Sequence, residues 1–302
     1  MRDFQEKRGL RATGACDDET WRALVEASWK LGDRLLVLVA PNMRGDDVGE
    51  LQATLGRIGF DCGRVDGIFG PRTAGALEDF QRNSGLLVDG VCGPITVRAL
   101  QILARQTGSG PGVSTLRELE ALTSTTRSLT DLRVVVGQFG GLSSLSRRLV
   151  QALRLRSATV ASSDEPDAAA QAAAANRFAA NVYIGFEATV DGASSVHYYA
   201  VPQFESAGGR LLATTIASEC AARIDGFAPE VRGMRLPVLR ETRMPAVLVT
   251  LGDIQRLVDH VPYLVTSVVA AIERWAQPQP VAKPAVDANP AVDDGAPSAS
   301  TM

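Results

Sequence analysis

The strongest constraint on the fold is an internal repeat in the first hundred residues. The pattern Phe-Gln-x3-Gly-Leu-x3-Gly-x-Cys-x3-Thr-x2-Ala-Leu begins at Phe4 and recurs without a gap at Phe80. The two copies are offset by 76 residues and agree at nine positions. A repeat of this kind indicates small equivalent units rather than one continuous domain.

A shorter repeat describes the structure of each unit. Residues 65–77 match residues 88–100 at an offset of 23, and both contain Asp-Gly, then Gly-Pro, then Thr. Asp-Gly favours a tight turn because Gly adopts positive φ without strain. Pro is well tolerated in the first turn of a helix, and spaced apolar residues follow it. Each unit is therefore predicted to be a helix, a turn and a second helix.

The motif resembles the peptidoglycan-binding domain 1 family, a small three-helix module. The resemblance is complete over 39–104 and partial over 1–38, where the first helix of the module is missing, so the chain is expected to begin inside a module. It implies binding of glycan or stem peptide around the Asp-Gly loops. The candidate contact residues are Asp66, Gly67, Phe69, Asp89 and Gly90.

These candidates have a simpler interpretation as turn residues. We favour it for each of the four Asp and Gly residues taken singly, because Asp and Gly in loops usually serve the turn itself. Phe69 is the better candidate for a ligand contact, since an aromatic ring exposed in a loop can stack on a sugar.

The pattern changes in the second half of the chain. Residues 105–130 are predicted to be a linker with a short helix at 115–122, because they are rich in Gly, Ser and Thr. From 131 to 276, short apolar runs alternate with helical segments, which predicts an α/β domain with a twisted, mostly parallel sheet covered by helices. The expected strands are 133–137, 157–161, 181–186, 195–201, 236–239 and 246–251. The expected helices are 142–155, 167–180, 207–224 and 264–275.

The second half resembles the zinc-dependent N-acetylmuramoyl-L-alanine amidases of the amidase 3 type. The order of four local sequences carries this resemblance: Gly140-Gly141, Ala-Asn-Val-Tyr-Ile-Gly-Phe-Glu-Ala, Val-His-Tyr-Tyr and Arg-Met-Pro-Ala-Val-Leu-Val. Such enzymes hold Zn²⁺ with two His and one Glu, leaving a position for water. The metal lowers the pKa of that water, and a further Glu acts as general base.

This chain departs from the family pattern at all four of these positions. Phe139 and Glu187 stand where the family has its two zinc-binding histidines. Leu142, or a neighbouring serine, stands at the Glu ligand, and Thr250 stands at the catalytic Glu. No Asp or Glu occurs anywhere between residues 132 and 163. We therefore expect a pseudoenzyme that has no catalytic residues, no metal ligands and no cofactor, with zinc required only if the protein is an active amidase.

The remaining metal-binding side chains do not form a recognisable motif. His197 lies among aromatic residues in a predicted strand and is expected to be packed. His260 lies near a helix boundary and is expected to be exposed or to cap the helix. The four cysteines are scattered, without a CxxC pair, and are expected to be reduced core residues. They are Cys16, Cys62, Cys92 and Cys220.

Composition and charge exclude several classes of partner. The net charge of −3 gives no electrostatic footprint for nucleic acid. No apolar run approaches the roughly 18 residues that a membrane span needs. The first eight residues are charged and contain no apolar core of a signal peptide. The sequence thus predicts a cytoplasmic protein, near a membrane only through its partners.

The combination of modules with a degraded zinc site resembles a group of actinobacterial amidase homologues. That group is associated with cytoplasmic control of peptidoglycan precursor synthesis, so the implied partners are peptidoglycan or its precursors and proteins of the precursor pathway. The alternatives are an active, exported cell-wall amidase and an extracellular peptidoglycan-anchoring adaptor. Residues 277–302 are rich in Pro, Ala and Asp and are predicted to be disordered. The candidate phosphorylation sites there are Ser298, Ser300 and Thr301.

Overall fold

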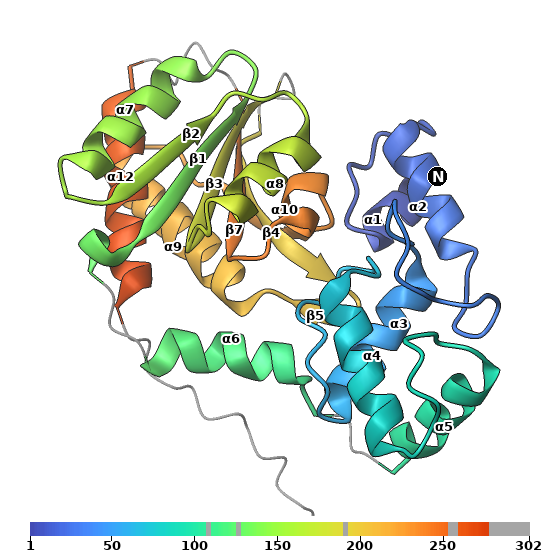
Figure 1. Cartoon of the computed structure of the whole chain (residues 1–302). Helices are drawn as coiled ribbons and strands as arrows, with labels where there is room; N and C mark the ends of the chain where they lie inside the picture. The colour runs from blue at the N-terminus through green and yellow to red at the C-terminus, as the bar shows by residue number, and fades with distance from the viewer. Residues whose placement is uncertain (107–109, 125–127, 190–192, 253–258, 278–302) are drawn as a thin grey trace, which may run out of the picture.

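The computed structural model describes residues 1–106, 110–124, 128–189, 193–252 and 259–277. A helical N-terminal part lies beside a C-terminal α/β part, and helix α6 (Val113–Ser124) connects the two (Figure 1). No helix within these ranges is long and apolar enough to span a bilayer. The candidate phosphorylation sites Ser298, Ser300 and Thr301 lie outside the described residues.

The helical part follows the repeat. Its helices are α1 (Arg2–Lys7), α2 (Asp18–Ala27), α3 (Asp46–Arg57), α4 (Pro71–Asn83) and α5 (Pro94–Ala104). Helices α4 and α5 each begin with the Pro of the Gly-Pro motif, as the sequence predicts. Helices α3, α4 and α5 surround a core that includes Leu51, Phe80 and Leu100. Leu36, from the segment after α2, joins this core and pairs with Cys92 through two backbone hydrogen bonds.

One buried glutamine organises the turn of each repeat unit. The side-chain amide of Gln81 donates to Asp89, to the Val91 carbonyl and to Thr96, and its oxygen accepts from the Asp89 and Gly90 amides. Gln52 makes the same five contacts with residues 66–73, and Gln5 makes a similar set with residues 13–20. In the units of Gln52 and Gln81, the recurring Asp, Gly and Thr therefore all bind one side-chain amide.

The described residues of the α/β part form one mixed, seven-stranded sheet. Its order is β2-β1-β3-β7-β4-β5, with β6 paired to β4. Neighbours β2, β1, β3 and β7 are parallel, whereas β4 is antiparallel to β7. The strands are β1 (Arg133–Phe139), β2 (Thr159–Ser163), β3 (Val182–Ala188), β4 (Ser195–Val201), β5 (Phe204–Glu205), β6 (Glu230–Met234) and β7 (Ala246–Leu251). The predicted α/β class with a mostly parallel sheet is confirmed.

Helices cover both faces of the sheet (Figure 1). On one face, α7 (Ser143–Arg154), α9 (Ala207–Arg223) and α12 (Val261–Ala276) pack on alternate strand residues such as Val134 and Ile184. On the other face, α8 (Ala168–Arg177) and α10 (Pro237–Glu241) pack on Val135 and Tyr183. This second core also contains Val65 of the helical part. The two parts of the molecule therefore share a core.

Two predicted elements differ in type or surroundings from the structure, β2 begins two residues later than the strand expected at 157–161, and β5 and β6 lie where no strand was predicted. Residues 236–239 were expected to form a strand, but they begin helix α10, with Pro237 in its first turn. Pro lacks the N–H that a strand would use, so it favours a helix start here. The predicted short helix of the linker is longer than expected and is docked. Its Glu118 accepts hydrogen bonds from Ser206 and from the Ala207 and Gly208 amides at the start of α9.

Replacing Gln81 with Leu should loosen the Asp89–Gly90 turn. The change leaves buried backbone groups without partners, which costs about 2–3 kcal/mol locally. We expect the Gly90 amide to exchange with solvent roughly 100-fold faster, as measured by native-state hydrogen exchange. Gln101→Leu, on the exposed side of α5, serves as the control and should leave this exchange rate unchanged. Equal Gly90 exchange in both variants would contradict the role assigned to Gln81.

Candidate functional site

The sheet brings together three of the positions at which the sequence resemblance places the zinc ligands and the base. Phe139, Glu187 and Thr250 are register partners across β1, β3 and β7, at the carboxyl ends of these parallel strands. Ligands of open α/β sheets bind at this edge. Leu142 follows the Gly140-Gly141 turn and occupies the N-cap position of α7, where it is buried. The sequence-based assignment thus selects residues that converge on one place in the fold.

The Thr250 hydroxyl belongs to a small polar cluster with residues of β4. Its oxygen lies 2.6 Å from the Ser195 hydroxyl and 3.2 Å from Nε2 of His197. Burial, with help from the positive charges of Arg11 and Arg232, lowers the pKa of His197 to about 4. His197 is therefore neutral at pH 7 and buried against the sheet, which confirms that it is a packed residue.

Glu187 is bound by a charged residue of the first repeat unit. Its carboxylate forms an ion pair with Arg11, which lies in the loop between α1 and α2. Glu19 of α2 also interacts electrostatically with Arg11, although burial raises the pKa of Glu19 above its usual value. The first repeat unit therefore reaches over the carboxyl edge of the sheet and places a guanidinium on the single carboxylate among the four degenerate positions.

These residues do not fit a zinc ion. Phe139 and Leu142 offer no lone pair, Thr250 is hydrogen-bonded to Ser195 and His197, and Glu187 is paired with a cation. A structural or catalytic zinc site needs at least three such ligands around one point. Within the described ranges, no three His, Cys, Asp or Glu side chains come together in a metal-binding group. The side chains at this edge therefore do not form a zinc site of the amidase type.

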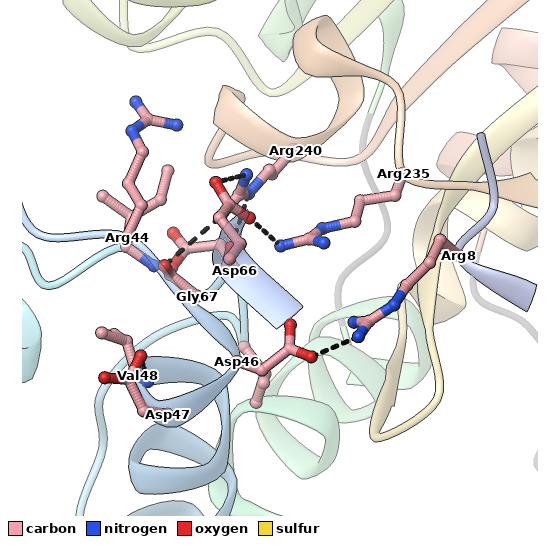
Figure 2. A network of polar contacts seen from close by, with 12 residues as sticks. Arg8, Arg44, Asp46, Asp47, Val48, Asp66, Gly67, Arg235 and Arg240 are labelled. Carbon is pink, nitrogen blue, oxygen red and sulfur yellow. Dashed lines mark hydrogen bonds and ion pairs between the residues drawn. The ribbon is translucent and has the colours of Figure 1, made fainter. Parts of the chain in front are cut away.

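A buried ion cluster fixes the first repeat unit on the α/β part. Glu26 of α2 binds both Arg235 and Arg240, and all three side chains are at most 10% exposed. The Arg235 amide donates to the Gly9 carbonyl at 2.7 Å. Figure 2 shows the Arg235 and Arg240 guanidinium groups in this network, together with the Arg8–Asp46 ion pair at 2.6 Å.

The same cluster covers one of the two candidate binding loops. Arg240 donates to the carbonyls of Asp66 and Gly67, at 2.6 and 3.3 Å (Figure 2). The hydroxyl of Tyr199 donates to the Val65 carbonyl just before them. The equivalent Asp89 is exposed, while Gly90 is buried beneath its own turn. Two loops with the same local geometry thus lie in different surroundings, one in the junction between the parts and one in solvent.

The expected role of Phe69 is wrong. We expected an exposed ring that could stack on a sugar, but Phe69 has no exposed surface and belongs to the core of α3, α4 and α5. A loop residue can point inward when its helices leave a space for it, as here. Phe69 therefore packs the unit and does not contact a ligand.

The expectation for the cysteines is partly wrong as well. Cys62, Cys92 and Cys220 are buried free thiols, whereas Cys16 is exposed. Burial raises the pKa of Cys62 and of Cys92 to about 12, so neither is a reactive thiolate at pH 7. His260 occupies the N-cap position of α12, but its side chain makes no capping hydrogen bond.

Sequence reasoning missed the residues that join the two parts. Arg11, Glu26, Arg235 and Arg240 carry no motif, and single charged residues on a helix are usually solvated. One signal was present in the sequence. Leu236-Pro237 marks a helix start, with Arg235 just before the helix and Arg240 in its last turn.

The pKa of His197 generates a pH-dependent prediction. Because the unfolded residue titrates near 6.5 and the folded one near 4, the unfolded chain binds more protons between these values. Stability should be full above pH 6.5 and fall by about 3 kcal/mol as the pH drops to 4. Urea unfolding measured at several pH values should show this dependence of stability on pH in the native chain and its loss in His197→Gln. The prediction would be contradicted if the free energy of unfolding depended on pH in the same way in both chains, or if NMR titration gave an imidazole pKa above 6.

Glu26→Gln should release the first repeat unit. The substitution leaves Arg235 and Arg240 buried without a counter-charge, and breaking such a cluster costs about 3–5 kcal/mol. We expect α1 and α2 to become sensitive to limited proteolysis while the α/β part stays folded. Glu50→Gln, an exposed carboxylate on α3, is the matched control and should remain resistant. Resistance in both variants would mean that Glu26 does not hold the junction.

Comparison with known proteins gives one domain match and several solved structures of low similarity. A family model described as "Putative peptidoglycan binding domain" matches residues 44–100. The solved structure of the amidase Ami1 from Mycobacterium smegmatis aligns with 50% of this chain and 99% of its own, at 13% identity and a TM-score of 0.44. AmiC2 of Nostoc punctiforme aligns with 48% of this chain and 96% of its own, at 16% identity and a TM-score of 0.39.

A curated relative is similar over most of the chain. The "N-acetylmuramoyl-L-alanine amidase CwlM" of Mycobacterium tuberculosis (strain ATCC 25618 / H37Rv) is 35% identical over 286 residues. The match covers 84% of this chain and 70% of that protein. The family resemblance inferred from the repeat and from the second half is thereby confirmed. The chain belongs to the N-acetylmuramoyl-L-alanine amidase family of which CwlM is a member, and it carries a peptidoglycan-binding domain before its amidase-like domain.

Proposed function

We propose that this chain is a catalytically inactive amidase homologue that acts by binding. Its ligands are peptidoglycan or its precursors, and its protein partners belong to the precursor pathway, whose activity it regulates from the cytoplasm. The observation that carries this proposal is the Arg11–Glu187 ion pair at the carboxyl edge of the sheet. A guanidinium from the first repeat unit binds Glu187, the residue at a position where the family resemblance places a zinc-binding histidine.

The side chains around this ion pair support the proposal. A hydrolase of this family requires a metal, a metal-bound water and a carboxylate base at one point. Here Phe139 and Leu142 are apolar, and Thr250 has a hydroxyl in place of a base. Loss of a single ligand can be compensated by a neighbour, whereas loss of all four roles removes each part of the mechanism.

The binding half of the proposal rests on the repeat units. The complete unit at 39–104 retains both Asp-Gly turns, each held by its buried glutamine. The Asp89 turn is exposed, and the Asp66 turn borders a pocket at the junction with the amidase-like domain. A protein that keeps two ordered binding turns while losing its zinc ligands is suited to recognition rather than hydrolysis.

Metal content and hydrolysis of the muramoyl–L-alanine amide bond test this function together. After incubation with Zn²⁺ and dialysis, the native chain should hold no stoichiometric zinc by elemental analysis and should hydrolyse no substrate. A variant with Phe139→His, Leu142→Glu, Glu187→His and Thr250→Glu, combined with Arg11→Ala, should bind about one zinc ion because it restores the ligand set.

The same four substitutions with Arg11 retained form the matched control. A guanidinium near the metal opposes its charge, so we expect weaker zinc binding in this control than in the fivefold variant. Circular dichroism would establish that both variants fold. Stoichiometric zinc, or amide hydrolysis, in the native chain would overturn the proposed function and identify an active amidase.

A further inference from the structure

Strand β2 forms one edge of the sheet, and its outer side has no neighbouring strand. It pairs with β1 alone, and the Thr159 amide donates to the Leu132 carbonyl, so Thr159 faces β1. The N–H and C=O groups of one residue point to the same side of a strand, and this side alternates along it. Those of Val160 and Ser162 therefore point away from the sheet. They form an open edge to which another strand can bind.

A groove lies between this edge and helix α7. Its volume is about 400 Å³, and its lining residues are Arg147, Val150, Gln151, Arg154, Leu155 and Ser162. Arg147, Gln151 and Arg154 are exposed, and their spacing places them on one face of α7. Leu155, just after the helix, is 78% exposed and adds an apolar contact surface. We call the groove together with the outer side of β2 the edge groove.

The edge groove carries positive charge without an acidic residue in its lining. From residue 132 to residue 163 the sequence contains five arginines and no Asp or Glu, although the whole chain has a net charge of −3. Arg147 donates to the Ser143 carbonyl at 3.2 Å, and Arg154 donates to the Val160 carbonyl at 3.1 Å. A carbonyl oxygen does not neutralise a guanidinium, so both arginines keep their charge for an anionic partner.

This charge distinguishes between possible occupants of the edge groove. Charged side chains on an edge strand discourage pairing between copies of one chain, and a second copy would bring its own arginines against these. Nucleic acid or an anionic bilayer offers negative charge but lacks backbone amides for the edge, and the net charge of −3 opposes both. An acidic, extended polypeptide supplies both the backbone groups and the carboxylates.

We propose that the edge groove binds an acidic, extended segment of a protein partner as an additional strand beside β2. The backbone of the segment pairs with the Val160 amide and with both backbone groups of Ser162. Its carboxylates, on alternate residues, bind Arg147 and the remaining N–H groups of Arg154, while an apolar side chain contacts Leu155. The inference goes beyond the proposed function, because it requires neither a peptidoglycan ligand nor an inactive site.

The test uses the full chain and a fluorescein-labelled peptide that repeats Thr-Glu four times, measured by fluorescence anisotropy. Thr favours the extended conformation, and the glutamates lie on one face of the extended peptide. We expect saturable binding that weakens as the salt concentration rises. A Thr-Gln repeat should bind about tenfold more weakly, and so should the Thr-Glu peptide methylated on every backbone nitrogen, which keeps the charge but cannot donate.

A pair of variants at one position isolates the backbone contact. Ser162→Pro removes an N–H that points away from β1, so it breaks no bond of the sheet and should weaken binding about tenfold. Ser162→Ala keeps this N–H and should bind as the native chain does. Circular dichroism would establish that both variants fold.

A second pair isolates the charge and does not alter the strand. Arg147→Gln combined with Arg154→Gln should weaken binding about tenfold and reduce its dependence on salt. Arg98→Gln combined with Arg105→Gln removes the same charge from exposed positions of α5 and its C-cap, and should bind as the native chain does.

Four outcomes would overturn the assignment of the edge groove. The first is the absence of saturable binding up to millimolar peptide. The second is equally tight binding of the methylated peptide or of an oligothymidylate of the same length, which would identify a general polyanion surface. The third is binding unchanged in folded Ser162→Pro. The fourth is a dimer of the native chain, by analytical ultracentrifugation, that Ser162→Pro dissociates. None of these bears on the proposed function, which fails only if the native chain holds zinc or hydrolyses the amide.

Discussion

The arrangement of the molecule depends on Glu26 and the two arginines that it binds. A carboxylate and two guanidinium groups leave water together at this point, and the cost of burying them is offset only when all three meet in good geometry. That requirement holds α2 against the loop and helix that contain Arg235 and Arg240. The hydrogen bonds from the Arg235 amide to the Gly9 carbonyl and from the Tyr199 hydroxyl to the Val65 carbonyl lie around the same cluster. The first repeat unit is thus part of the amidase-like domain's surface.

Docking of the first repeat unit on the amidase-like domain has different effects at the carboxyl edge of the sheet and at the junction between the two parts. At the carboxyl edge of the sheet it delivers Arg11 to Glu187, so a position that could contribute to a metal site carries an ion pair instead. At the junction it brings Arg235 and Tyr199 beside Asp46 and creates a pocket that neither part has alone. The same docked arrangement therefore pairs Glu187 with a cation and forms a pocket lined by both parts.

The repeat units show how identical local structure acquires different roles. Gln52 and Gln81 hold their turns with the same five contacts, and Asp66 and Asp89 are equivalent in sequence and geometry. Yet the carbonyl of Asp66 accepts from Arg240, whereas Asp89 faces solvent. Turn chemistry accounts for both aspartates, and only their surroundings distinguish them.

The sequence by itself determined the repeat, the α/β class, most helices and strands, and the residue types at the positions where the family resemblance places the zinc ligands and the base. These features depend on local periodicity, turn residues and the identity of a few side chains, all of which are present in the sequence. It also predicted that Phe139, Glu187 and Thr250 belong to one site, and their register in the sheet agrees. The burial of Phe69, the helix at Pro237 and the partners of Arg11 and Glu26 were decided by tertiary structure. Their reason is physical: whether a side chain is buried or paired depends on which distant segment lies against it, and no local pattern encodes that choice.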